Sequence, residues 1–155
     1  MGNIHDWVEL GLFVITFIGL VVTIFSHREQ LKSLNQQLKL NFFADYTRRY
    51  QEIMLHLPMN IYEDTFSFET MEAADRESCL KYIRAYFNLC SEEYDLWRSG
   101  NIEQRIWERW EEGIRATIAT KAFYSAWHIA HLSTYYYPEF VDLIENMIKE
   151  RDQSL

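Results

Sequence analysis

Two histidines, His128 and His131, stand three residues apart, a spacing that can place two imidazoles of one helix on the same metal ion. No Glu-x-x-His or His-Glu-x-x-His pattern accompanies them, and two ligands do not make a metal site. The sequence also contains no glycine-rich phosphate-binding loop. We therefore expect no metal and no cofactor.

The carboxylate pairs Glu92–Glu93 and Glu111–Glu112 fall on neighbouring predicted helices, where paired carboxylates can carry acid–base catalysis. In an acidic domain such pairs are more often a solvated face, and we interpret them so. Cys79 and Cys90 are eleven residues apart in one predicted helix, roughly 16 Å along its axis, so they cannot form a disulfide with each other. We interpret both as small buried side chains in a reducing compartment.

Arg49 and His56 are the nearest candidates for the arginine–histidine pair of small helical ribonucleases, which lies on one helix. A polar residue is expected after the arginine, but Tyr50 follows it here. A helical ribonuclease is therefore the last of our functional alternatives, and we expect the protein to have no enzymatic activity.

An apolar segment precedes all of these residues. Leu10 to Phe25 contains no charge, and the 20 residues from Trp7 to Ser26 match, as a helix, the roughly 30 Å hydrocarbon core of a bilayer. A secretory signal peptide would begin with positive charge and end at a cleavage site, whereas here Asp6 and Glu9 precede the apolar residues. The sequence predicts one transmembrane helix.

Charges beside this segment predict its orientation. Arg28, Lys32 and Lys39 follow it and no lysine or arginine precedes it, so the positive-inside rule places the C-terminal part in the cytoplasm. Trp7 is expected as the aromatic anchor at the outer interface, and Arg28 and Lys32 as basic anchors inside. The predicted location is the bacterial inner membrane, with a single pass and the N-terminus outside.

Residues between Leu20 and Leu57 include no Gly or Pro, which predicts one helix that continues from the membrane through a juxtamembrane connector at 27–41. Two stripes of side chains at heptad spacing run along this helix. The apolar stripe is Phe13, Phe17, Leu20, Ile24, Leu31, Leu34 and Leu38, with His27 at the membrane boundary. The polar stripe is Thr16, Gly19, Thr23, Ser26, Gln30, Ser33 and Gln37, and its extension toward the N-terminus passes through Leu12 to Glu9.

An uncharged polar stripe that continues through a bilayer needs a partner other than lipid. One alternative is that Thr16, Gly19 and Thr23 let a second helix approach closely. The other is that several copies surround a water-filled path that the stripe lines, with Glu9 near its outer mouth. Both alternatives imply a homo-oligomer.

The remaining residues, 42–155, predict helices with short connections and no strand. The predicted fold class is all-α, with an outer end and transmembrane helix at 1–26 that continues into a cytoplasmic four- to five-helix bundle. We expect a loop at 59–74. Predicted helix starts are Asp75, Asn101 in a capping box with Gln104, Thr120 and Pro138, and predicted stops are Pro58 and Gly100.

Three stretches of the soluble domain, NFFADYTRRYQEIMLHLP, IRAYFNLCSEEYDLW and IWERWEEGI, resemble an uncharacterised family of small bacterial single-span proteins. This resemblance implies no activity. The architecture, with a short outer end, one span and a helical cytoplasmic domain, is similar to that of the accessory membrane proteins of type VI CRISPR systems. That similarity implies an oligomeric pore that disturbs the inner membrane during antiphage defence.

Charge limits the partners of the soluble domain. Residues 50–155 carry 19 acidic against 10 basic side chains, a balance that repels phosphate backbones, so we expect no direct nucleic-acid binding. The expected partners are membrane lipid, other copies of the chain and a cytosolic protein of a defence system. Our leading hypothesis is a homo-oligomeric effector that forms or gates a pore. The alternative is a membrane-tethered module that recruits a cytosolic partner to an aromatic surface around Tyr135, Tyr136 and Tyr137.

Overall fold

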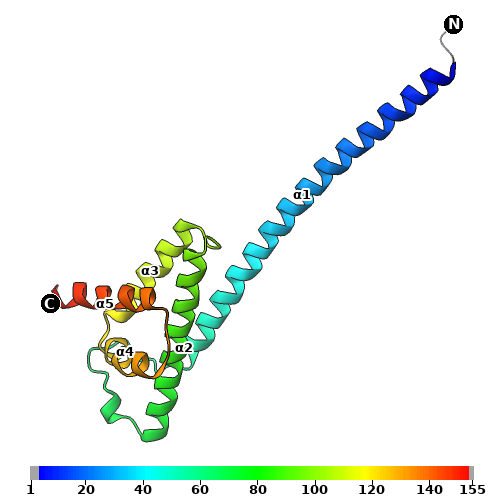
Figure 1. Cartoon of the computed structure of the whole chain (residues 1–155). Helices are drawn as coiled ribbons and strands as arrows, with labels where there is room; N and C mark the ends of the chain where they lie inside the picture. Colours follow the sequence, from blue (N-terminus) through cyan, green and yellow to red (C-terminus); the bar gives the residue numbers. More distant parts are fainter. Residues whose placement is uncertain (1–3, 154–155) are drawn as a thin grey trace. The chain divides into compact units, whose positions relative to one another are not determined.

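The structure is a computed structural model that describes residues 4–153, except the side chains of residues 4–6, 132 and 133. Within this range the chain is helical and contains no strand (Figure 1), which confirms the predicted all-α fold class. The elements are α1 (Ile4–Leu55), a 3-10 helix η1 (Phe68–Thr70), α2 (Ala73–Arg98), α3 (Gln104–Ile118), α4 (Lys121–Ser133) and α5 (Pro138–Gln153).

The chain divides into two compact units, of which the first ends at Asp45 and the second runs from Tyr46 to Leu155. The first unit is a single stretch of α1, and from Trp7 onward this helix is long and apolar enough to cross a membrane. The prediction that one helix continues without a break beyond the apolar segment is confirmed. Since a lone helix has no core, most apolar side chains of residues 7–45 are exposed, and Val21 and Phe42 are half-buried.

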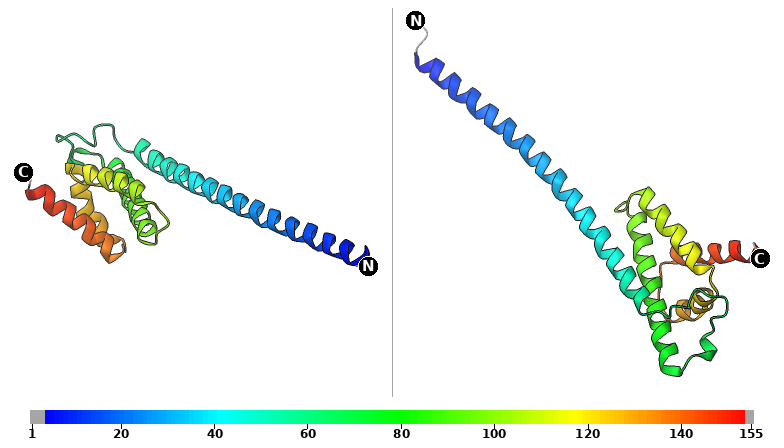
Figure 2. Two further views of the ribbon diagram at one scale, coloured as in Figure 1. Left: turned by 90° about the horizontal axis from the view of Figure 1, so that it is seen from above. Right: turned by 180° about the vertical axis from the view of Figure 1, so that it is seen from behind.

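The second unit contains the end of α1 and the helices α2 to α5. Helix α2 packs against α3 and α4, and α3 also packs against α4 and α5. Figures 1 and 2 show α2 and α3 side by side and running in opposite directions. The chain reverses direction at Gly100, which has a φ of +74°. Glycine adopts such a positive φ without steric strain, so this residue ends α2 as the sequence predicts.

The core of the second unit is mainly aromatic. Phe87 of α2 and Phe123 and Trp127 of α4 are completely buried, and the rings of Phe87 and Trp127 meet edge to face with their centroids 4.9 Å apart. Edge-to-face pairs add about 0.5–1.5 kcal/mol to the stabilisation that burial alone gives. Cys79 and Cys90 are both free and buried, as expected. The aromatic side chains thus hold α2 and α4 in one arrangement.

Two predicted helix starts are wrong. Asp75 lies in the first turn of α2, where its carboxylate interacts favourably with the positive end of the helix dipole. The N-cap residue is Glu72, which has an extended backbone conformation. Asn101 and Gln104 form no capping box, because α3 begins at Gln104 itself after Glu103. The Gln104 amide is used elsewhere: its oxygen accepts a bond of 2.8 Å from Nε1 of Trp97.

The other boundaries agree better with the sequence. Pro138 begins α5, and Thr120 precedes α4 as predicted, although its hydroxyl donates to the main-chain oxygen of Thr117 (2.8 Å) rather than capping the helix. Helix α1 ends at Leu55, just before Pro58. The expected loop at 59–74 consists of turns, the 3-10 helix η1 and the first residues of α2.

Phe123→Ala should lower the free energy of unfolding of the second unit by about 3–5 kcal/mol, because it removes a fully buried ring and leaves a cavity. Tyr135→Ala is the matched control, since the Tyr135 side chain is 90% exposed and its loss should cost less than about 0.5 kcal/mol. Chemical unfolding followed by tryptophan fluorescence measures both. Equal midpoints for the two variants would contradict this description of the core.

Candidate functional site

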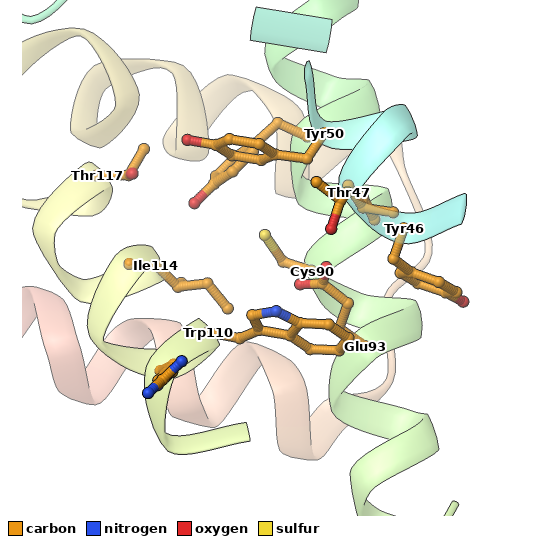
Figure 3. A pocket seen from close by; sticks show the side chains of 12 residues that line it. Tyr46, Thr47, Tyr50, Cys90, Glu93, Trp110, Ile114 and Thr117 are labelled. Atoms are coloured by element: carbon orange, nitrogen blue, oxygen red, sulfur yellow. The ribbon is translucent and has the colours of Figure 1, made fainter. Parts of the chain in front are cut away.

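A pocket of about 280 Å³ opens between the end of α1, α2 and α3, entirely within the second unit (Figure 3). Each helix contributes one face at the spacing of three and four residues that aligns side chains on a helix. These faces are Tyr46 and Tyr50 from α1, Tyr86, Cys90 and Glu93 from α2, and Trp110, Ile114 and Thr117 from α3. The pocket is therefore a direct product of helical periodicity.

Glu93 is the polar centre of this pocket. Its side chain is only 7% exposed, and its carboxyl forms no hydrogen bond or ion pair with any residue that the structure describes. Figure 3 shows the Glu93 carboxyl and the Cys90 thiol pointing into the same space, with the Tyr50 ring on one side of it and the Trp110 indole on the other. A buried carboxyl without a partner is costly, so its presence in a pocket is a functional signal.

The adjacent carboxylate, Glu92, is in a different environment. It accepts two bonds from the Arg49 guanidinium, of 2.7 and 3.1 Å, and one of 3.4 Å from the Tyr46 hydroxyl. The Arg49 guanidinium also lies 5.2 Å from the centre of the Tyr46 ring. The Arg49 guanidinium is thus bonded to Glu92 and forms no ion pair with Glu93.

Burial raises the pKa of the Glu93 carboxyl to about 8, against a smaller lowering by the charge of Arg49 and with a further increase from Glu92. At neutral pH this carboxyl is mostly protonated. Burial, and next the charge of Glu93, also raises the pKa of the Cys90 thiol well above its ordinary value. Cys90 is therefore not a thiolate nucleophile.

The interpretation of Glu92–Glu93 as a solvated face is wrong for Glu93. The signal that identifies it was present, because Glu93 follows Cys90 by three residues and Tyr86 by seven, so it falls on the buried face of α2. Of the other pair, Glu111 forms an ion pair with Arg115 at 3.2 Å on the surface of α3.

No protein-family model matches the chain, and neither a curated protein nor a solved structure is similar enough to count as a match. The resemblances drawn from the sequence stay predictions. Functional conclusions therefore rest on the geometry.

Arg49 and His56 do not share a site in the structure. The Arg49 guanidinium is bonded to Glu92, whereas the His56 ring stacks on Tyr82 with 4.4 Å between ring centroids. Nδ1 of His56 donates to the main-chain oxygen of Glu52 at 2.7 Å. The pair expected of a helical ribonuclease is not brought together.

The histidines of α4 are packed against aromatic rings. His128 meets Tyr124 edge to face, with 4.9 Å between centroids, and His131 stacks on Trp127 at 5.5 Å. Among the described residues, no group of three or more His, Cys, Asp or Glu side chains lies close enough to hold a metal ion.

The predicted aromatic surface is wrong at its middle residue. Tyr136 is buried, with its ring 5.5 Å from that of Trp127 and 5.9 Å from that of Phe140. Tyr135 and Tyr137 are exposed. The surface of an interaction module would therefore contain these two tyrosines only.

The polar stripe lies along α1 in the first unit, and each of its members is exposed, as are the predicted anchors Trp7, Arg28 and Lys32. The hydroxyls of Thr16 and Thr23 donate to the main-chain oxygens of Leu12 and Gly19, at 2.8 Å each. These bonds satisfy both hydroxyls inside the helix. The two threonines therefore tolerate lipid or a close helix neighbour as well as water.

Glu93→Gln should stabilise the protein at high pH. The pKa of Glu93 rises on folding, so its favourable contribution is complete below about pH 4.5 and is lost as the pH rises through 8. Because glutamine stays neutral, the variant should have nearly the wild-type thermal midpoint at pH 5 and a higher one at pH 9, where its free energy of unfolding should exceed that of the wild type by roughly a few kcal/mol.

The measurement is thermal unfolding of the full-length protein in detergent at both pH values. Glu112→Gln is the matched control, because this exposed carboxyl of α3 lies outside the pocket. If the thermal midpoints of the wild type and Glu93→Gln change with pH in parallel, the pocket does not disfavour the charged form of Glu93.

Proposed function

We propose that the chain is a homo-oligomeric membrane effector. Helix α1 crosses the bacterial inner membrane once with the N-terminus outside, copies associate through this helix, and its polar stripe lines or gates a path across the membrane. The observation that carries the proposal is that the apolar and polar stripes continue along the same uninterrupted helix, from the apolar segment into the connector.

The leucines of the connector support association between copies. About 20 residues of helix cover the hydrocarbon core, so the connector that follows Ser26 extends into water. Leu31, Leu34 and Leu38 lie on it at heptad spacing, and more than half of each side chain is exposed. Leucines at this spacing on a solvated helix are the seam of a coiled coil. A second copy of the same helix supplies the matching seam.

The angle between the stripes supports an assembly of several copies. At about 100° per residue, the centres of the polar and apolar stripes lie roughly 100° apart around the α1 axis, so they are neighbouring faces. A helix in a ring turns one face to the axis and an adjoining face to its neighbour. The polar stripe suits the axis, and the apolar stripe suits the contact between copies.

The Thr16–Gly19–Thr23 part of the polar stripe also suits close packing. Apart from its chain neighbours and the backbone of α1 itself, nothing lies within 4 Å of the position that a Cβ of Gly19 would take, so a partner helix can approach there. A dimer packed through these small residues is the outcome in which α1 serves as an anchor without a path.

The second candidate is a membrane-tethered module that recruits a cytosolic protein. The observation in its favour is the exposure of Tyr135 and Tyr137 on the second unit, since exposed tyrosines are common anchors of protein interfaces. Recruitment should survive substitutions in the polar stripe and be lost in a Tyr135→Ala, Tyr137→Ala double variant. A role in antiphage defence rests on the architectural resemblance and applies to either candidate.

Thr16→Leu, Gly19→Leu and Thr23→Leu together should reduce ion conductance at least tenfold, because three leucines replace the polar wall with apolar side chains that exclude water. Purified protein in planar bilayers or ion-loaded vesicles gives the measurement. Val14→Leu, Ile18→Leu and Val21→Leu together are the control, since they place three leucines on another face of the same segment. Unchanged conductance in the first triple variant, with intact membrane insertion, would exclude the stripe as the wall of a path.

Leu31→Ser, Leu34→Ser and Leu38→Ser together should reduce the oligomeric mass of the detergent-solubilised protein, because they remove the apolar seam of the connector. Leu40→Ser is the control, since Leu40 is equally exposed but lies off the stripe. Light scattering coupled to size exclusion measures both. An oligomer of wild-type mass in the triple variant would place the contact between copies elsewhere.

A further inference from the structure

The Glu93 pocket has the composition of a binding site for a cation. Within the described residues nothing donates a hydrogen bond to the Glu93 carboxyl, and only 7% of the surface of this residue is exposed, at the pocket that it lines. Buried polar groups in folded proteins almost always have a partner, and exceptions mark functional sites or bound molecules. A partner for this carboxyl would be a hydrogen-bond donor, and a positively charged donor would also neutralise the carboxylate.

The walls of the pocket favour positive charge. Four aromatic rings line it, of which Tyr46 stacks on Trp110 with 5.8 Å between centroids and Tyr50 lies 6.4 Å from Tyr86. The face of an aromatic ring carries negative partial charge, and cages of such rings bind ammonium groups. A volume of about 280 Å³ is at the lower limit of small-molecule sites. The space therefore suits a small ligand.

We propose that this pocket binds a small organic cation, an amine in its ammonium form, with the Glu93 carboxylate as its counter-charge and the rings of Tyr50 and Trp110 on either side of it. The proposal is independent of the function of α1, because every lining residue belongs to the second unit.

Titratable groups lie near Glu93 on each of the three helices that form the pocket. From α1, Arg49 is engaged by Glu92, so it is not available to Glu93 without breaking that pair. From α2, the buried Cys90 is an uncharged neighbour. From α3, Arg109 lines the pocket and is exposed. Arg109 is the one group of the pocket lining that can compete with an external cation, which makes it a necessary part of the test.

Binding of the cation should release a proton. The Glu93 carboxyl is mostly protonated at pH 7, since its pKa lies at about 8, and it must ionise to pair with an ammonium group. The affinity should therefore rise roughly tenfold per pH unit below pH 8 and level off above it. A neutral ligand that fits the pocket would show neither the proton release nor this pH dependence, because it does not require Glu93 to ionise.

The test is isothermal titration calorimetry of the full-length protein in detergent with methylammonium, tetramethylammonium, putrescine and phenethylamine, and with 3-phenylpropan-1-ol as a neutral analogue. We expect one or more of the amines to bind at least tenfold more tightly than the alcohol. For a primary amine, titrations at pH 7 in buffers of different ionisation enthalpy should show release of nearly one proton. Glu93→Gln should weaken binding at least tenfold, and Glu112→Gln should leave it unchanged.

Three results would overturn the proposal. The first is that no amine binds more tightly than the neutral analogue. The second is that Glu93→Gln binds as the wild type does while its unfolding at pH 5 shows a native fold. The third is that binding occurs only in an Arg109→Gln variant, because Arg109 would then be the native partner of Glu93.

Discussion

The bidentate ion pair between Arg49 and Glu92 determines the character of the second unit's pocket. Both partners are partly exposed, so the pair contributes little free energy, of the order of 1 kcal/mol or less. The pair matters because it decides which of two adjacent carboxylates is neutralised. Arg49 pairs with Glu92, the more exposed of the two, and not with Glu93. Tyr46 reinforces this choice, because its ring lies against Arg49 and its hydroxyl donates to Glu92. Glu93 is left buried in the protonated form, and the pocket takes its chemistry from that residue.

The stability that keeps Glu93 buried comes from elsewhere, chiefly from aromatic packing between α2 and α4. Phe87 and Trp127 are completely buried and meet edge to face, whereas the surface ion pairs are solvated. Burial of rings of this size stabilises a domain by several kcal/mol for each ring, enough to offset one buried carboxyl. Energy and specificity are thus supplied by different sets of residues.

Helix positions and the core were predictable from the sequence because they depend on periodicity, which is a property of the chain alone. Pro138 and Gly100 mark boundaries by intrinsic backbone preference, and both were identified. Asp75 and Asn101 were assigned wrongly because capping depends on the backbone conformation before the helix, which side-chain type does not determine. Glu93 was missed for another reason: neighbours on a helix point about 100° apart, so two adjacent carboxylates cannot be interpreted as one face.

Neither unit is self-sufficient, and the two deficiencies differ in kind. The first has exposed apolar side chains and no core, and we propose that lipid and other copies of α1 cover them, while the second has a core beside a pocket that contains a carboxyl without a partner. Ionisation of Glu93 would place two negative charges beside Arg49 and strengthen the attraction that holds the end of α1 on α2. Because α1 is one unbroken helix, the residues that respond to charge in the pocket belong to the same element as those predicted to cross the membrane. The proposed cation therefore lies against the end of α1, since Tyr46 and Tyr50 of this helix line the pocket.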